Sequence, residues 1–137
     1  MLVAIRIKGL IDVEEKIKET LKRVRLRRKY SAVLLENNVE NRKILGNIRN
    51  FISYGEISEE MLEKLIRERG KSLDKSKIDV KKVIDGLQKK RLQELGLKPF
   101  FRLHPPRGGI ETKKHAGVGK GVLGENKEIN KLLEKML

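Results

Sequence analysis

Residues 1–9 read MLVAIRIKG, and the pattern within them is the clearest structural signal in the chain. The apolar side chains Val3, Ile5 and Ile7 alternate with alanine or cationic side chains at positions 4, 6 and 8. A period of two predicts a β-strand with one buried face. Gly9 ends the pattern, so the strand is expected to stop there.

The residues that follow predict a helix and a second strand. Asp12 is a plausible N-cap, and apolar side chains recur at helical spacing at positions 13, 17, 21 and 24. Residues 31–36, SAVLLE, are short and apolar enough for a well-buried strand. The first 36 residues therefore predict the strand–helix–strand unit of an α/β layer.

Helices dominate the expected structure after residue 37. A second helix is expected to carry one apolar stripe through positions 44, 45, 48, 51 and 52 and to end at Tyr54 and Gly55. Ser58 is the expected N-cap of a third helix that Gly70 ends. A fourth helix is predicted over residues 80–95, a third strand over 100–104, and a last helix from about residue 126.

The composition indicates a polyanionic partner. The 137 residues contain 33 Lys and Arg against 19 Asp and Glu, a formal net charge of +14. So much like charge disfavours compaction, so a protein usually carries it for a nucleic acid or similar partner. The alternative is a lysine-rich surface without a specific partner. Nothing in the N-terminal residues resembles a signal peptide or a transmembrane helix, so a cytosolic protein is expected.

The segment over residues 100–124, FFRLHPPRGGIETKKHAGVGKGVLG, indicates the same kind of partner. Pro105 and Pro106 stiffen the chain, and the glycines allow backbone N–H groups to approach phosphate. Arg107 can present its planar fork to a phosphate or a guanine edge. Phe100 and Phe101 could stack on bases, although at most one of them faces outward and both can be covered by the core.

Two further groups of cations accompany this segment. Residues 22–29, KRVRLRRK, hold six cations where the first helix should end. Compensation of the helix dipole needs one or two, so we interpret the cluster as phosphate-contacting, with a solvated helix end as the alternative. Arg42, Lys43 and Arg49 lie on the polar face of the second helix, where charged side chains are often only solvated.

Three kinds of catalytic or metal site have little support in the sequence. The GVGKG run at 117–121 lacks the hydroxyl residue that a Walker loop needs after its lysine. The chain has no cysteine, and its two histidines, His104 and His115, do not form a ligand cluster. No serine–histidine grouping is apparent either. We therefore expect no enzyme, no cofactor and no metal.

Three blocks of sequence resemble a known family. They are AIRIKG at 4–9, NRKIL at 41–45 through FISYGE at 51–56, and RLHPPRGG at 102–109 with KH at 114–115 and GVLG at 121–124. With them the chain resembles ribosomal large-subunit protein thirty in its archaeal form, which is similar to eukaryotic large-subunit protein seven. The family usually has a glycine where this chain has Lys43, so Lys43 is expected to supply a side-chain phosphate contact instead.

The resemblance implies a fold and a function. The expected fold is an α/β (α+β) ferredoxin-like βαβαβ core with a largely antiparallel three-stranded sheet, extra helices and a basic glycine-rich extension. The expected layout is one rRNA-binding domain over 1–137, with a core at 1–56 and 97–104, a helical insertion at 57–96, an arm at 105–124 and a C-terminal helix at 125–137. The arm is predicted to order against RNA.

The implied function is that of a structural constituent of the large ribosomal subunit, in the cytoplasm, binding large-subunit rRNA and neighbouring ribosomal proteins. Neither a membrane nor a small-molecule substrate is expected as a partner. An extra-ribosomal RNA- or DNA-binding regulator is the alternative. The residues predicted to contact RNA are Arg25, Arg27, Arg28, Lys29, Arg42, Lys43, Arg49, His104, Arg107, Gly108, Gly109, Lys113, Lys114, His115 and Lys120.

Overall fold

A computed structural model describes residues 1–9, 14–71, 79–87, 94–107, 109, 112–115 and 121–137. Its strands are β1 (Leu2–Arg6), β2 (Ser31–Leu35), β3 (Ile52–Glu56), β4 (Phe101–Arg102), β5 (Thr112–His115) and β6 (Gly121–Glu125). Its helices are α1 (Glu15–Arg23), α2 (Val39–Asn47), α3 (Glu59–Arg69), α4 (Val80–Gly86) and α5 (Ile129–Met136).

The strands form one mixed sheet in the order β4-β2-β1-β3-β6-β5. β1 is antiparallel to both of its neighbours, β2 and β3, and β4 is antiparallel to β2. β6 runs parallel to β3 and to β5. The predicted α+β architecture with a βαβαβ core is confirmed, in the order β1-α1-β2-α2-β3. The expected sheet of three strands is wrong, because six strands pair.

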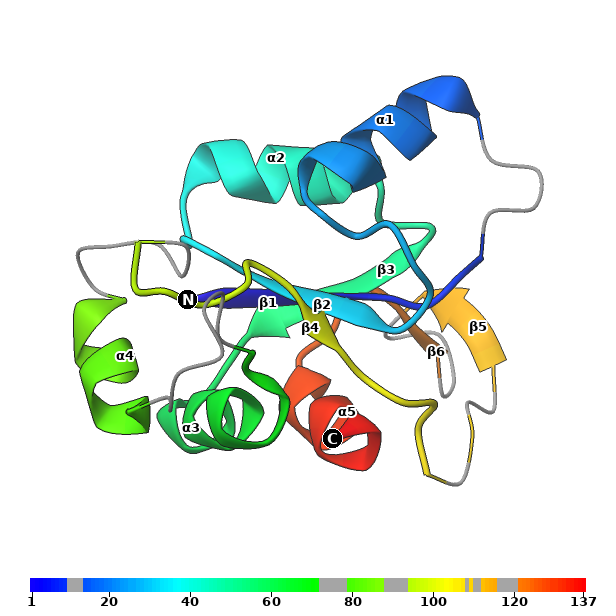
Figure 1. The fold of residues 1–137 in the computed structure, drawn as a ribbon. Coiled ribbons are helices and arrows are strands. Elements are labelled where there is room, and N and C mark those ends of the chain that lie inside the picture. Colours follow the sequence, from blue (N-terminus) through cyan, green and yellow to red (C-terminus); the bar gives the residue numbers. More distant parts are fainter. Residues whose placement is uncertain (10–13, 72–78, 88–93, 108, 110–111, 116–120) are drawn as a thin grey trace.

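Helices cover both faces of this sheet (Figure 1), with α1 and α2 on one side and α3 and α5 on the other. Two apolar clusters match these two faces. Leu2 and Ala4 of β1 pack on the α1/α2 side, whereas Val3 and Ile5 pack on the α3/α5 side. The prediction of one buried face for this strand is therefore wrong. All five residues of β1 are buried, including Arg6.

The third strand of the core is β3, which the sequence pattern placed in the end of a helix. Helix α2 stops at Asn47, and Ile52 and Tyr54 point into the α1/α2 cluster from the sheet. On the opposite face, a Cβ at Gly55 would lie 2.5 Å from the Asn126 carbonyl oxygen and 2.9 Å from Ile129. Gly55 therefore allows the start of α5 to approach the sheet closely.

The predicted strand over 100–104 is reduced to β4, which pairs with β2 at one edge of the sheet. The segment over 105–124, expected as an arm outside the core, contributes β5 and β6. Leu123 of β6 is 2% exposed and belongs to the core. Backbone pairing with β3 and one buried leucine are sufficient to place this glycine-rich stretch in the sheet.

Local signals predicted two helices correctly. The Ser58 side chain accepts a hydrogen bond from the Met61 N–H (3.3 Å), and α3 ends at Gly70. Helix α5 buries all four of its predicted apolar side chains, at positions 129, 132, 133 and 136. The predicted N-cap of the first helix is wrong, because Glu14 is the N-cap of α1; Asp12 itself lies outside the described residues. Residues 88–93 of the predicted fourth helix also lie outside the described residues.

Candidate nucleic-acid interface

The loop over residues 24–30, which joins α1 to β2, presents the largest of the predicted cation groups. Arg25, Arg27, Arg28 and Lys29 are all exposed there. The Lys29 ammonium lies 5.0 Å from the centre of the Tyr30 ring, within the range of a cation–π contact. We refer to residues 25–29 as the basic loop.

Hydrogen bonds to the end of α1 fix the start of the basic loop. The Arg25 N–H donates to the Lys22 carbonyl (3.1 Å) and the Leu26 N–H donates to the Leu21 carbonyl (2.8 Å). Arg25 has a φ of 66°. This is the Schellman pattern, in which glycine usually occupies the left-handed position. Leu26 is fully buried, so it anchors the loop in the α1/α2 cluster.

Arg6 of β1 anchors the basic loop through a side-chain hydrogen bond. Its guanidinium is 1% exposed and donates to the carbonyls of Leu26 (2.8 Å), Lys8 (3.0 Å) and Gly9 (3.3 Å). Burial lowers the pKa of Arg6 below its ordinary value. The Arg6 carbonyl in turn accepts from the Tyr30 N–H (2.7 Å). Both ends of the basic loop are thus tied to the end of β1.

The sequence interpretation missed this role because it assigned Arg6 to a solvent-facing side of the strand. Two signals could have pointed to it. Arg6 is the single charged residue within the otherwise apolar run of residues 2–7, and Leu26 is an apolar residue within a run of cations. A buried arginine needs acceptors, and loop carbonyls at a strand end supply them.

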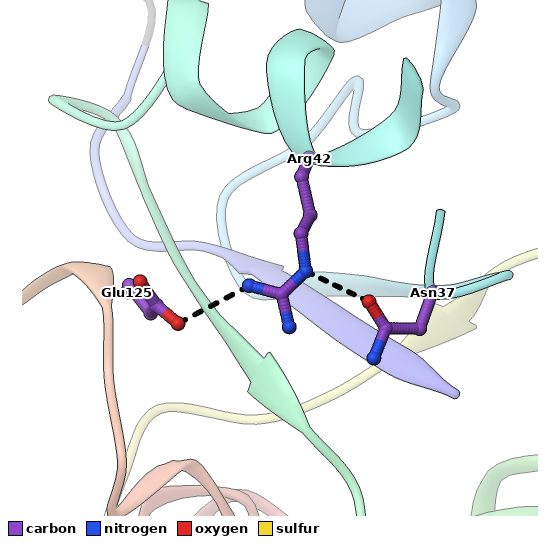
Figure 2. Close-up of polar contacts among 3 residues, drawn as sticks. All are labelled: Asn37, Arg42 and Glu125. Atoms are coloured by element: carbon purple, nitrogen blue, oxygen red, sulfur yellow. Dashed lines mark hydrogen bonds and ion pairs between the residues drawn. The ribbon is translucent and has the colours of Figure 1, made fainter. Parts of the chain in front are cut away.

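The cations predicted on the second helix differ in position and in what they contact. Helix α2 ends at Asn47, so the placement of Arg49 on its polar face is wrong, and Arg49 lies in the turn before β3. Lys43 and Arg49 are exposed. Arg42 bridges two segments (Figure 2): its Nε donates to Asn37 Oδ1 (2.7 Å), and its Nη1 lies 3.2 Å from Glu125 Oε1. Arg42 therefore connects α2 to β6. Its guanidinium is 42% exposed, so a phosphate contact there would be shared with protein acceptors.

Tyr54 lies beneath this group of charges. Burial and the Glu125 carboxylate raise the pKa of its hydroxyl above the ordinary value of 10.0, against an opposing effect of Arg42 and Arg49. Asn50 is exposed after the C-terminal end of α2. Arg42 and Arg49 thus act on a β3 tyrosine, and Arg42 also pairs with a β6 carboxylate.

His104 and Arg107, on either side of the two prolines, contact the end of α5. Arg107 donates to two carbonyls of the last turn, from its N–H to Lys135 (3.0 Å) and from Nη2 to Glu134 (3.1 Å). The His104 ring contacts the backbone oxygens of Pro105 (2.8 Å) and Leu137. These contacts place cationic or polar groups at the negative end of a helix.

Arg107 nevertheless stays exposed, and Gly109 turns the chain beyond it with a φ of 75°. Gly108 and Lys120 lie outside the described residues. The strand β5 contains Lys113, Lys114 and His115 at the edge of the sheet, and their side chains are also outside the described part. Their contact with RNA stays a prediction.

The described residues offer neither a metal site nor a membrane-spanning helix. They contain no group of three or more His, Cys, Asp or Glu side chains that could hold a metal ion. Among their helices, none has the length and hydropathy to span a membrane.

Comparison with known proteins gives the relatives of this chain. Residues 2–51 match the family model described as ribosomal protein L30p/L7e. A protein of Archaeoglobus fulgidus is 38% identical over 99% of both chains, and one of Aeropyrum pernix is 39% identical over 97% of this chain and 96% of its own. A third, of Methanosphaera stadtmanae, is 33% identical over the full length of both. All three are named large ribosomal subunit protein uL30. Because similarity of this degree extends over nearly the whole chain, the chain belongs to the ribosomal protein L30p/L7e family.

Proposed function

We propose that this chain is a structural constituent of the large ribosomal subunit that binds and stabilises folded rRNA. The relatives named uL30 support the ribosomal assignment, since they match along the full chain. The observation that carries RNA binding is the basic loop, four exposed cations on a backbone held at both ends. A fixed loop loses little conformational entropy on binding, so its cations are preorganised for phosphates.

The mechanism is neutralisation of closely packed phosphates. The basic loop supplies one group of cations, and Lys43 on α2 together with Arg49 after its end supplies another. In this proposal Arg42, His104 and Arg107 hold the elements in place and contact RNA only with the part of each side chain that protein acceptors leave accessible. Backbone contacts are expected to outnumber base contacts, as is usual in RNA recognition by shape.

The role is structural rather than catalytic, and its place is the ribosome in the cytoplasm, beside other ribosomal proteins. The whole chain of 137 residues acts as one rRNA-binding domain. Helices α3 and α4 form its insertion, and cations of the segment over 105–124 contact RNA. The alternative, an extra-ribosomal regulator, is favoured by the net charge of +14 alone.

The test is the salt dependence of binding to in vitro transcribed large-subunit rRNA. With five to eight phosphates contacted, log affinity should fall with log salt at a slope of about −4 to −7. Replacing Arg27, Arg28 and Lys29 by alanine should reduce the slope in magnitude by about two to three. A control replaces Lys81, Lys82 and Lys127, which are exposed elsewhere, and should leave more of the slope intact.

An affinity that does not depend on salt would overturn this mechanism. If the salt slope decreased equally in the loop variant and in the control, only the net charge of the protein would matter, as expected for a non-specific RNA binder. A regulator would differ in another way, because it would not stay with large subunits during sedimentation after a salt wash.

A further inference from the structure

A small hollow outside the predicted RNA-contacting set is lined by Arg69, Lys71, Lys98, Phe100 and Arg102. Two distant segments form it: the end of α3 with the residues after it, and the stretch that leads into β4. The Lys98 N–H donates to the Lys71 carbonyl (2.8 Å), so the backbones of the two segments are joined. We refer to these five residues as the edge hollow.

The size of the edge hollow suits one small group. Its cavity volume is about 60 Å³. A water molecule needs roughly 10–15 Å³ of such space, so about four to six atoms fit. A phosphate group with its oxygens matches this size, whereas a whole nucleoside does not.

The charge of the edge hollow suits an anion. Four of its five residues are cationic, and within the described part of the chain no carboxylate forms an ion pair with any of them. Compensation of the α3 dipole does not explain the group, because only Arg69 belongs to the last turn of α3. The other three cations, Lys71, Lys98 and Arg102, lie outside the helix. Cations gathered without an acid repel one another, and a bound anion removes that cost.

Phe100 orients one of these cations. The Arg102 guanidinium lies over its ring, 5.7 Å from the ring centre. Phe100 is itself half-buried against the α1/α2 cluster, so it forms a fixed wall. A guanidinium held on an aromatic face keeps its N–H edges available for an oxyanion.

The edge hollow continues the surface of the basic loop. Arg102 pairs with Ser31 in the β4–β2 register. Ser31 follows the basic loop and Tyr30 directly in the sequence. The Leu103 N–H donates to the Tyr30 carbonyl (3.0 Å), which fixes this junction. An RNA backbone lying on the basic loop can therefore extend to the edge hollow.

We propose that the edge hollow binds one backbone phosphate of rRNA, between the cations of α3 and those of the β4 segment. The proposal rests on the proposed function and adds a contact that the sequence interpretation did not include. Phe100 acts in it as a wall that positions Arg102, and no base stacks on the ring.

The test compares two variants of the full chain for binding to in vitro transcribed large-subunit rRNA over a range of KCl concentrations. The first replaces Lys71 and Lys98 by alanine. The matched control replaces Lys81 and Lys82 by alanine. Both are exposed on α4, so this substitution removes the same amount of charge at another place. Thermal unfolding verifies that both variants fold. Inorganic phosphate is titrated separately, with the amide resonances of Lys98 and Arg102 followed by NMR.

We expect Lys71→Ala/Lys98→Ala to reduce the salt slope in magnitude by about one and the control to keep the wild-type slope. Equal slopes for both variants would overturn the proposal while the wild-type slope still supports rRNA binding. Unchanged rRNA binding, combined with amide shifts on adding inorganic phosphate, would assign the hollow to a free phosphate compound and overturn the RNA assignment. A wild-type protein without salt-dependent rRNA binding would overturn the proposed function itself.

Discussion

Arg6→Met is the substitution that tests most sharply how the basic loop is held. Arg6 donates three hydrogen bonds to carbonyls at the end of β1 and in the basic loop, and at 1% exposure its side chain is too buried to touch RNA. Methionine replaces the unbranched aliphatic part of the arginine side chain but has no donors. The substitution therefore separates support of the loop from direct contact with a ligand.

The size of the effect follows from the three acceptors. The Leu26 carbonyl bond is buried, and a buried acceptor left without a donor costs about 1–3 kcal/mol. The Lys8 and Gly9 carbonyls are only partly buried and can bond to water instead. Removing the desolvated guanidinium returns some free energy. We expect a net loss of about 1–3 kcal/mol in the free energy of unfolding, or roughly 3–6 °C in Tm for each kcal/mol.

Denaturant unfolding measures this loss, and rRNA binding is measured well below the Tm of the variant. Affinity should fall although Arg6 makes no contact with RNA, because the loop carbonyl is released. Lys8→Met is the control, since it removes a neighbouring charge without removing an acceptor. Arg6→Met with wild-type stability would refute the anchoring argument. Lower stability with unchanged rRNA affinity would show that the anchor serves the fold alone.

Other predictions follow from single residues. Arg25→Gly should raise the free energy of unfolding by about 1 kcal/mol, because glycine adopts the left-handed backbone without strain. The affinity for rRNA should fall, because the substitution removes one cation of the basic loop. A lower free energy of unfolding in urea would contradict this prediction. Gly55→Ala should lower the free energy of unfolding by about 1–3 kcal/mol, since the added Cβ would meet the start of α5. A urea unfolding curve identical to that of the wild type would show that α5 can move to accommodate the Cβ. The pKa of Tyr54 is raised, so above pH 10.0 the folded state keeps a phenolic proton that the unfolded chain releases, and the free energy of unfolding falls as the pH rises past that value. In Tyr54→Phe this contribution to the alkaline loss of stability should be absent. Phenolate absorbance of a Tyr30→Phe variant reports the titration of Tyr54 directly. Arg107→Ala should lower Tm by a few degrees, because its guanidinium donates to a carbonyl of the last turn of α5; unchanged Tm with weakened rRNA binding would show that Arg107 contacts RNA without supporting the helix end.

Elements with local signals were predictable from the sequence. Helix α3 carries its own cap and stop at Ser58 and Gly70, and α5 has a regular apolar stripe. Such features depend on residues within a few positions of one another, so one sequence is sufficient to predict them.

Strand β3 shows why the remainder of the fold was missed. Ile52 fits the helical spacing of the α2 stripe as well as the alternation of a strand. What decides between them is pairing with β1 and β6 and the close approach of α5 at Gly55, which all come from distant residues. The same holds for β6, which the sequence does not distinguish from a glycine-rich loop, because its position in the sheet depends on the pairing of Gly124 with Ser53 of β3.

The candidate site divides in the same way. Exposure of the basic loop was predicted, because six cations in eight residues cannot be buried. The contacts of Arg42 with Glu125 and of Arg107 with Glu134 were not, since these partners lie 83 and 27 positions away along the chain. The edge hollow was missed for the same reason, because Lys71 and Lys98 approach each other only in the folded chain.

In the function we propose, the basic loop holds the chain in the large ribosomal subunit. The most direct measurement is a sucrose-gradient profile of cell lysate after a moderate salt wash, with the wild-type chain and the Arg27/Arg28/Lys29→Ala variant each followed by a tag. We expect the wild type only with large subunits and the variant shifted toward the free fractions. A wild-type chain found mainly in the free fractions would contradict the account.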